Sequence, residues 1–298
     1  MKQLNSGYYF ALAAALIWSG FILVSRLGGI SELNGYDVIA IRYLTCTMIV
    51  LPIWWFKFRF KLFTKRLWVC SMIGGLAYAM FTFQGFQMAS AAHAAILLPG
   101  MMPIFIMICA VLINGERPCI HKWLAIVIIT IGVAALFWPI MLSTGSLSQG
   151  HLLLIGGSLC WAIFSVLIKR WEITPWQATV SLAVLTCLVY MPYYLVLAPK
   201  KINIELWQDI ALQAFYQGFL ATIVQMIFYV RAVQLIGPSS MGATMAIVPL
   251  ISGISAIFLF SEPASTSLFS GLLLVSLGSF IMHININFWR KNSALRQH

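Results

Sequence analysis

The chain has 298 residues, of which 61% are hydrophobic and only 8% are charged. A soluble domain carries roughly 25% charged residues and about 45–50% apolar ones, so no soluble fold of this length could bury so much apolar surface. The formal net charge is +11. No stretch is both soluble and basic enough to form a DNA-binding domain, so we interpret the basic residues as signals that orient the chain in the membrane.

Ten apolar segments are long enough to cross a bilayer, for which an α-helix needs about 20 mostly apolar residues. They lie at 8–30, 36–55, 67–88, 91–113, 123–142, 151–168, 176–198, 208–236, 238–260 and 266–287. The first segment is too long for the apolar core of a secretory signal peptide, so we expect it to be retained as a span. Irregular backbone cannot face lipid, and the short connections therefore predict a compact all-α bundle of about ten transmembrane helices.

The basic residues indicate which loops are cytoplasmic. Counted from a cytoplasmic N-terminus, the inner segments hold most of the 18 Lys and Arg residues, with a cluster between 57 and 66. The outer loops hold only Lys200 and Lys201. Because cytoplasmic loops carry the excess of Lys and Arg, we predict a multi-pass protein of the cytoplasmic (inner) membrane with both termini in the cytoplasm.

Three residues of the first half recur in the second half at a constant offset. Each is followed 146 positions later by a residue of the same type: Pro103 by Pro249, Glu116 by Glu262, and Gly132 by Gly278. Each half holds five spans, so the second half must enter the membrane with opposite polarity. Such inverted repeats are typical of secondary transporters. We predict repeats at 1–142 and 148–288, followed by a cytoplasmic tail at 289–298.

Several sequence motifs resemble those of EamA-type members of the drug/metabolite transporter superfamily, over essentially the whole chain. They are "IWSGFILVSR" in the first span, "AIRYL" in the second, "P-x12-E" at the ends of the fourth and ninth, "FYVRAVQLIGPSSMGATMAIVPLISGISAIFLFSEP" at 228–263 and "GLLLVSLG" in the tenth. The resemblance implies a central cavity lined mainly by spans 1, 3, 4, 6, 8 and 9. It also implies transport of amino acids, nucleobases, vitamins, siderophores or similar metabolites, often outward. The segment "QGFQMASAAHAAI" at 84–96 departs from the family pattern and leaves substrate identity open.

Polar and aromatic residues of four spans are the candidate substrate-binding residues. They are Trp18, Tyr78, Thr82, Trp161, Gln225 and Tyr229. When Gly85 is aligned with Ala232, positions 78, 82 and 85 of span 3 correspond to positions 225, 229 and 232 of span 8. Each set has i, i+4 and i+7 spacing and therefore lies on one face of its helix. Each face then combines a small residue with hydrogen-bonding groups, which suits a polar ligand. The alternatives are hydrogen bonds between helices for the polar groups, and lipid or interface positions for the tryptophans.

Four basic side chains lie within or at the ends of spans: Arg26, Arg42, Arg231 and His93. A charge inside a span is costly and is by default a functional-site hypothesis. Alternatively, the arginines reach the membrane boundary, or Arg26 and Arg42 pair with Glu32 and Asp37 in the first outer loop. His93 is either a group that titrates near neutrality or a hydrogen-bonded structural residue.

Prolines interrupt the fourth and ninth spans and suggest kinked helices. Pro99, Pro103 and Pro249 cannot donate to the helical ladder, and Gly100 and Gly253 lie near them. Matched kinks in both halves suit hinges for alternating access, whereas the alternative is a fixed bend needed for packing. Glu116 and Glu262 lie at matched helix ends. We expect them to cap the helices that follow, with gating or coupling as the alternative.

The sequence predicts a carrier in preference to a membrane enzyme or a scaffolding protein, with a channel as the remote alternative. It holds no HExxH or GxSxG motif and no charge-ringed pore, which argues against a membrane enzyme and a channel. We predict a secondary transporter of a small polar metabolite such as an amino acid, working by alternating access as an exporter or facilitator. The alternative is a proton- or substrate-coupled antiporter for drugs, nucleobases or vitamins. We expect no cofactor, metal or nucleic-acid partner, and a monomer or weak homodimer in the bilayer.

Overall fold

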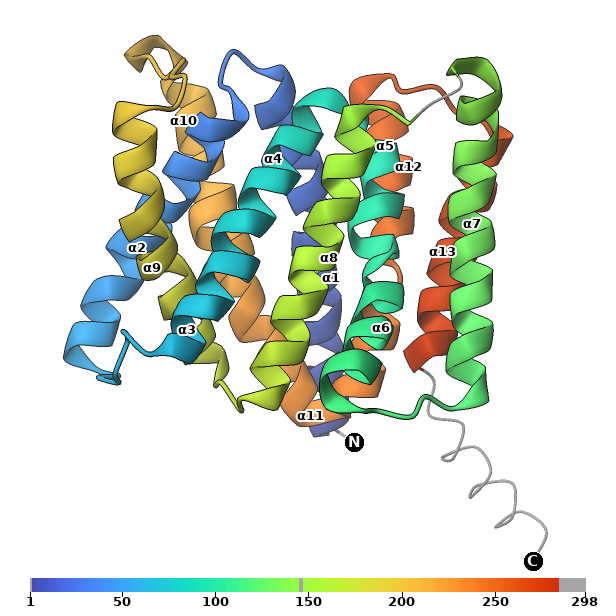
Figure 1. Ribbon diagram of the computed structural model, residues 1–298, viewed down its shortest axis with the longest axis horizontal. Coiled ribbons are helices and arrows are strands. Elements are labelled where there is room, and N and C mark those ends of the chain that lie inside the picture. The colour runs from blue at the N-terminus through green and yellow to red at the C-terminus, as the bar shows by residue number, and fades with distance from the viewer. Residues whose placement is uncertain (1, 145–146, 284–298) are drawn as a thin grey trace, which may run out of the picture.

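The computed structural model describes residues 2–144 and 147–283, and within these ranges the chain consists of helices and connecting loops. The predicted all-α membrane fold is confirmed (Figure 1). The first half contains α1 (Lys2–Ile30), α2 (Gly35–Phe56), α3 (Lys65–Cys70), η1 (Ser71–Ala77), α4 (Tyr78–Met88), α5 (Ala91–Ala95), η2 (Ile96–Gly100), α6 (Met102–Asn114) and α7 (Ile120–Thr144). The second half contains α8 (Gln149–Arg170), α9 (Pro175–Val196), η3 (Ile204–Leu206), α10 (Trp207–Gln213), η4 (Ala214–Val224), α11 (Gln225–Met245), α12 (Val248–Phe260) and α13 (Thr266–His283).

Eight helical segments of the described chain are long and apolar enough to cross a membrane, and two shorter apolar helices, α12 and α13, complete the bundle. We expected a boundary between spans 8 and 9 near residue 237. Helical backbone runs through that position to Met245, and the ladder is interrupted farther on, within span 9, at Ala246–Ile247. Pro249 explains this interruption. A proline cannot donate to the carbonyl four residues earlier and its ring clashes with that carbonyl, so the helix ends at Met245.

The two halves repeat one another in their helix boundaries. Helices α6 and α12 each have 13 residues and begin at positions 102 and 248, which are 146 apart. Both end at a left-handed residue, Gly115 with φ 67° and Ser261 with φ 51°. The next helices begin at 120 and 266, again 146 apart. The helix boundaries thus repeat with the same offset of 146 residues as the three pairs of identical residues in the sequence.

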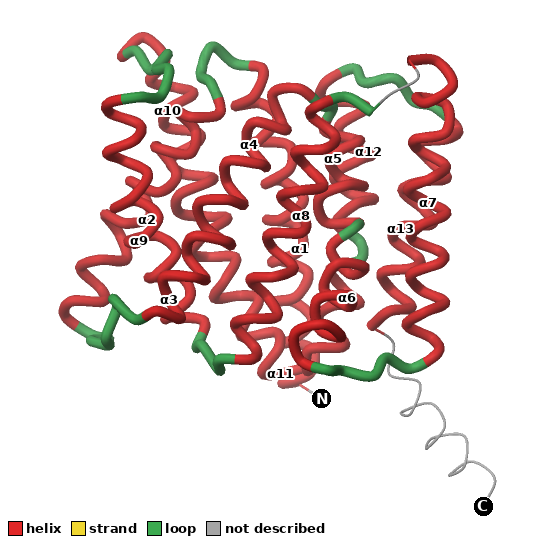
Figure 2. Tube along the Cα trace, in the orientation of Figure 1, coloured by secondary structure: helices red, strands yellow, loops and turns green. Residues whose placement is uncertain are grey.

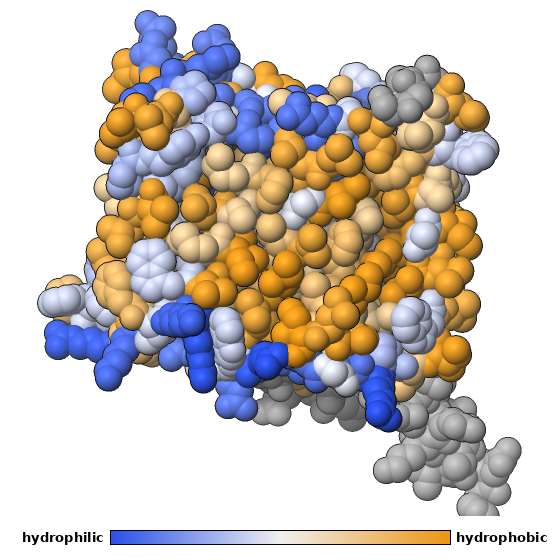
Figure 3. All heavy atoms as spheres, in the orientation of Figure 1, coloured by the Kyte–Doolittle hydropathy of each residue, from blue (hydrophilic) through white to orange (hydrophobic). Residues whose placement is uncertain are grey.

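The halves are inverted with respect to each other. In Figure 1 the chain of α1 rises from the lower end of the bundle, whereas α8 descends from the upper end. The start of α1, the loop at 57–64 and the end of α13 lie at the same end. Loops gather at both ends, with one short turn at mid-height (Figure 2). On the face that Figure 3 shows, polar residues flank a broad apolar band, as expected for a protein surrounded by lipid.

A glycine contact between α7 and α13 joins the two halves symmetrically. A Cβ on Gly278 would meet Ile129 Cγ1 at 2.6 Å and Ile129 N at 3.0 Å. A Cβ on Gly132 would meet Val275 Cγ2 and N at 3.0 Å each. Gly132 and Gly278, like Ile129 and Val275, are equivalent under the repeat. Small residues allow membrane helices to approach closely, so this contact lies on the pseudo-two-fold axis of the bundle.

Hydroxyl and amide side chains start several of the helices. Asn34 and Asp37 form a capping box at α2, and Thr174 and Gln177 form one at α9. Ser90 and Ser148 accept hydrogen bonds from the third residue of α5 and α8, respectively. These caps satisfy backbone N–H groups that a helix start leaves unpaired.

Replacing Gly278 by valine should destabilise the protein. The new Cβ would lie against the backbone of α7, which cannot move aside as a flexible side chain can, and overpacking of this kind costs about 1–3 kcal/mol. Thermal unfolding of the purified protein in detergent should show a lower Tm. Ala134→Val, on the exposed face of α7, is the matched control and should leave Tm close to the parent value. Equal Tm values for the two variants would contradict a close α7–α13 contact.

Candidate substrate-binding cavity

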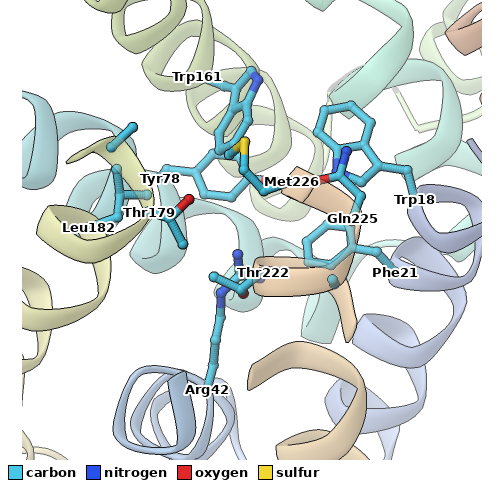
Figure 4. A pocket seen from close by; sticks show the side chains of 12 residues that line it. Trp18, Phe21, Arg42, Tyr78, Trp161, Thr179, Leu182, Thr222, Gln225 and Met226 are labelled. Atoms are coloured by element: carbon cyan, nitrogen blue, oxygen red, sulfur yellow. The ribbon is translucent and has the colours of Figure 1, made fainter. Parts of the chain in front are cut away.

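A cavity lies in the interior of the bundle and is lined by residues from both halves (Figure 4). The first half contributes Trp18, Phe21, Arg42 and Tyr78. The second half contributes Trp161, Ala178, Thr179, Leu182, Ala221, Thr222, Gln225 and Met226. The cavity volume is about 30 Å³, which is room for one or two water molecules. A smaller hollow of about 10 Å³ shares Trp18, Phe21 and Tyr78 and extends to Pro99.

Aromatic rings from three helices form one wall of the cavity. The rings of Trp18 and Trp161 are 5.8 Å apart at 61°, and those of Tyr78 and Trp161 are 5.0 Å apart. The structure thus brings together four of the six residues proposed from the sequence, since Gln225 lies among the same lining residues. The rings of Trp18, Tyr78 and Trp161 are amphipathic and offer a ligand both apolar surface and hydrogen-bonding groups.

Tyr78 and Gln225 follow equivalent irregularities in spans 3 and 8. Each is the first residue of an α-helix that follows a π-helical segment, η1 and η4. These two positions are 147 apart, the offset that the alignment of Gly85 with Ala232 uses. A π-helical turn disturbs the regular hydrogen-bond ladder and is often found at functional sites. Here Tyr43 Oη donates to Gly75 O of η1 at 3.0 Å, which satisfies one displaced carbonyl.

Arg42 is the one charged residue among those that line the cavity, and it is 6% exposed. Its Nη1 donates to Gln217 Oε1 at 3.3 Å, and Gln217 Nε2 donates in turn to Ser25 Oγ at 3.0 Å. The guanidinium carbon lies 5.4 Å from the ring centre of Phe21 and 5.8 Å from that of Phe83. The positive charge is therefore surrounded by an amide and by aromatic faces.

The pairing of Arg26 and Arg42 with loop carboxylates, one alternative from the sequence, does not occur in the structure. Asp37 closes the capping box of α2 and accepts a hydrogen bond from Tyr194 Oη at 2.6 Å. Glu32 is exposed. Arg26 Nη1 instead donates to Phe86 O at 2.6 Å, near the end of α4. A cation at that end satisfies a terminal carbonyl and complements the helix dipole, so this contact stabilises the end of α4.

Thr82 and Tyr229 do not line the cavity. Thr82 is fully buried between α4 and α8, where a Cβ on Gly157 would meet its Oγ1 at 2.6 Å. Tyr229 is 37% exposed and is not among the residues that line the cavity. Four residues advance a helix by one full turn and about 40° more. This rotation is enough to move a side chain from the edge of a narrow cavity to a neighbouring position.

Spans 2 and 7 line the main cavity where the resemblance implied spans 4 and 9. Arg42 comes from α2, and Ala178, Thr179 and Leu182 come from α9. Span 4 reaches only the smaller hollow. The prolines of spans 4 and 9 mark interruptions: Pro99 lies in η2, while Pro103 and Pro249 are the second residues of α6 and α12. The expected kinks are therefore present in both halves.

Sequence reasoning missed several lining residues: Phe21, Ala178, Thr179, Leu182, Ala221, Thr222 and Met226. Phe21 follows Trp18 by three positions and shares its helical face, a signal that could have identified it. The threonine hydroxyls were a weaker signal, because a membrane helix commonly satisfies them itself. Thr179 Oγ1 indeed donates to Pro175 O at 2.9 Å, and Thr222 Oγ1 to Gln217 O at 2.6 Å.

His93 lies away from the cavity and contacts the other half of the chain. Its Nδ1 is 3.0 Å from Nε2 of His151, and Ser148 Oγ is 3.0 Å from Nδ1 of His151. The two rings therefore link α5 to α8 at the end of the bundle where α8 begins. Arg231 is exposed on α11 and is not among the lining residues.

The two matched glutamates have different partners. Glu262 accepts hydrogen bonds from Ala91 N at 2.7 Å and Ala92 N at 2.8 Å. It thus caps α5 of the opposite half, and the expectation that it caps the helix following it was wrong. Glu116 pairs with Lys169 Nζ at 2.8 Å. The hydrogen bond from this ammonium group lowers the pKa of Glu116 below its usual value.

An inverted pair of five-helix halves around a shared interior cavity defines a membrane transporter. The sequence model of the EamA-like transporter family matches residues 5–138 and 148–284. The chain therefore belongs to the EamA-like transporter family, as the sequence motifs indicated.

The chain is also similar to a bacterial transporter and to a solved structure. The chain is 26% identical over 223 residues to the "Uncharacterized transporter YyaM" of Bacillus subtilis (strain 168), and the match covers 70% of each protein. A solved structure described as "Crystal structure of protein" has a TM-score of 0.60 at 17% identity, and the match covers 93% of this chain and 96% of that chain. The structural likeness shows that the fold is shared.

Glu262→Gln should reduce stability more than Glu116→Gln. The first variant loses charge-assisted bonds to two N–H groups, and a bond to a charged group contributes about 1.5–3 kcal/mol. The second loses an exposed ion pair, which contributes about 0–1 kcal/mol. Thermal unfolding in detergent at neutral pH should therefore give the lower Tm for Glu262→Gln. A larger loss in Glu116→Gln would contradict the capping role of Glu262.

Proposed function

We propose that this protein is a secondary carrier for a small polar metabolite such as an amino acid. The observation that carries the proposal is the cavity between the two halves, whose wall includes Trp18 and Tyr78 from one half and Trp161 and Gln225 from the other. A site shared in this way changes its access when one half moves relative to the other. The aromatic rings supply apolar contact area. Gln225 can donate and accept hydrogen bonds, and the hydroxyls of Thr179 and Thr222, which donate to backbone carbonyls, can accept them.

Transport by alternating access requires the cavity to widen. Its volume of about 30 Å³ is far below the roughly 300–1,000 Å³ of typical small-molecule pockets. The helical ladder is interrupted at Met101 in span 4 and at Ala246–Ile247 in span 9. These interruptions at equivalent depths provide flexible points about which the two halves can move. Movement of the two halves about these points would expose the cavity to each side of the membrane in turn, which suits an exporter or a facilitator.

We further propose that transport is not coupled to a proton or sodium relay through the cavity. The lining residues include no carboxylate. Among the seven acidic residues, Asp37 is the buried one, and its oxygens are engaged by the α2 cap and by Tyr194. The His93–His151 pair is the alternative titrating group, and it would suit proton-coupled antiport. Substrate uptake into proteoliposomes should equilibrate without an imposed ion gradient, and uphill accumulation driven by a proton gradient would favour antiport.

Gln225→Ala should weaken transport without preventing folding. The loss of one hydrogen-bonding group to a polar ligand costs about 1–3 kcal/mol, which raises KM by roughly tenfold or more. Proteoliposomes should first be screened with a panel of radiolabelled amino acids, and saturable uptake should then be compared between variants. Gln208→Ala, at an exposed position of α10, is the matched control and should keep the parent KM. Uptake that rises linearly with concentration would indicate a channel in place of a carrier.

The proposed orientation, with both termini cytoplasmic, can be tested with a native cysteine. Cys119 is exposed, whereas the other five cysteines are buried or half-buried. A membrane-impermeant maleimide should therefore leave intact cells unlabelled and should label Cys119 in inside-out vesicles. A Lys200→Cys variant in a Cys119→Ser background should give the opposite pattern, because the connection between α9 and α10, which includes residue 200, lies at the end of the bundle opposite to the loop between α6 and α7 (Figure 1). Labelling of Cys119 in intact cells would reverse the orientation.

A further inference from the structure

Arg42 carries a buried positive charge for which the protein offers no negative partner. All seven acidic residues lie within the part of the chain that the structure describes. Five are exposed or lie at the ends of the bundle on other partners: Glu32, Glu116, Glu172, Glu205 and Glu262. Asp209 is half-buried near the start of α10, and Asp37 is bonded to Tyr194. Within that part of the chain the one ion pair is between Lys169 and Glu116.

The groups around Arg42 only partly compensate this charge. One amide oxygen, Gln217 Oε1, accepts from Nη1, and the buried Nε has no acceptor among the described residues. Placing an unpaired charge in a membrane interior is costly, and a stable fold would gain by replacing it with an apolar side chain. The aromatic faces of Phe21 and Phe83 reduce this cost but leave the net charge unchanged.

The guanidinium is placed where a ligand can reach it. Figure 4 shows the Arg42 side chain extending from α2 toward Thr222, with its nitrogen atoms facing the space between Tyr78, Thr179 and Gln225. A guanidinium presents several N–H donors in one plane, a geometry that matches a carboxylate. The remaining wall is uncharged and includes four aromatic rings beside aliphatic side chains, so the cavity combines one fixed positive charge with apolar surface.

We propose that Arg42 binds the carboxylate of a small organic monoanion whose apolar body lies against Trp18, Trp161 and Tyr78. This inference rests on the proposed carrier function and shifts the favoured substrate from a zwitterion such as an amino acid to a monoanionic carboxylate. The single cation favours a monoanion, because a phosphate dianion would leave one uncompensated negative charge inside the bundle. In the absence of substrate, Gln217 and the neighbouring rings hold the guanidinium in place.

Acid and amide pairs of the same shape test this proposal on the intact protein. The purified protein in detergent is titrated with 3-phenylpropanoate and its amide, with indole-3-acetate and its amide, and with phenyl phosphate. Thermal shift and tryptophan fluorescence report binding. Each carboxylate should bind roughly tenfold or more tightly than its amide, and phenyl phosphate should bind more weakly than the carboxylates at a pH where it is a dianion. This comparison needs no variant.

Variants then assign the effect to Arg42. Arg42→Met should abolish the preference for acid over amide, and Arg42→Lys should retain part of it. Arg231→Gln removes a charge outside the cavity and should keep the full preference. Equal binding of acid and amide by the parent protein, no binding of either carboxylate, or an acid preference that persists in Arg42→Met would each overturn the proposal. Saturable uptake of a neutral metabolite by the same preparation would leave the carrier function standing, so the two failures are distinguishable.

Discussion

The absence of water from the bilayer interior is the constraint on which this structure depends. Every backbone N–H and C=O there must find a partner within the protein, which is why the spans are helical. Where the helical ladder changes, other groups complete it. Tyr43 reaches a carbonyl of η1, and Thr186 Oγ1 donates to Ser71 O at 3.3 Å. Irregular backbone thus occurs inside the bundle, next to the cavity, and this irregularity sets the direction of Tyr78 and Gln225.

The duplicated halves share a backbone plan but have diverged in chemistry. Helices α6 and α12 begin and end at equivalent positions, and the α7–α13 contact is symmetric. The polar groups of the two halves are not arranged symmetrically. Glu262 caps α5 of the other half, whereas Glu116 pairs with Lys169. Tyr78 aligns with an amide, and the charge in the cavity comes from the first half alone. In the carrier that we propose, inverted symmetry therefore provides for the movement, and its local loss gives the cavity a distinct chemical character.

Sequence reasoning recovered what depends on composition and local register. The apolar segments, the constant offset, the proline interruptions and the cavity positions of Trp18 and Gln225 all follow from neighbours along one helix. It did not recover which helices meet. That Asp37 bonds Tyr194 and is therefore not available to Arg42 depends on the contact of α2 with α9, more than 150 residues apart along the chain. The absence of Tyr229 from the lining residues depends on a rotation of about 40°, which a sequence pattern cannot resolve against a cavity this narrow.

The π-helical segments also bear on how these spans tolerate changes in length. A π-helical turn accommodates more residues than an α-helical turn. Loss of one residue within η1 or η4 can therefore be absorbed by a return to regular α-helix, while the flanking residues keep their faces. A deletion elsewhere in span 3 or span 8 would instead turn the following residues by about 100°. These two segments are thus the positions at which insertions and deletions could have entered the duplicated halves without rotating Tyr78 or Gln225 out of the cavity.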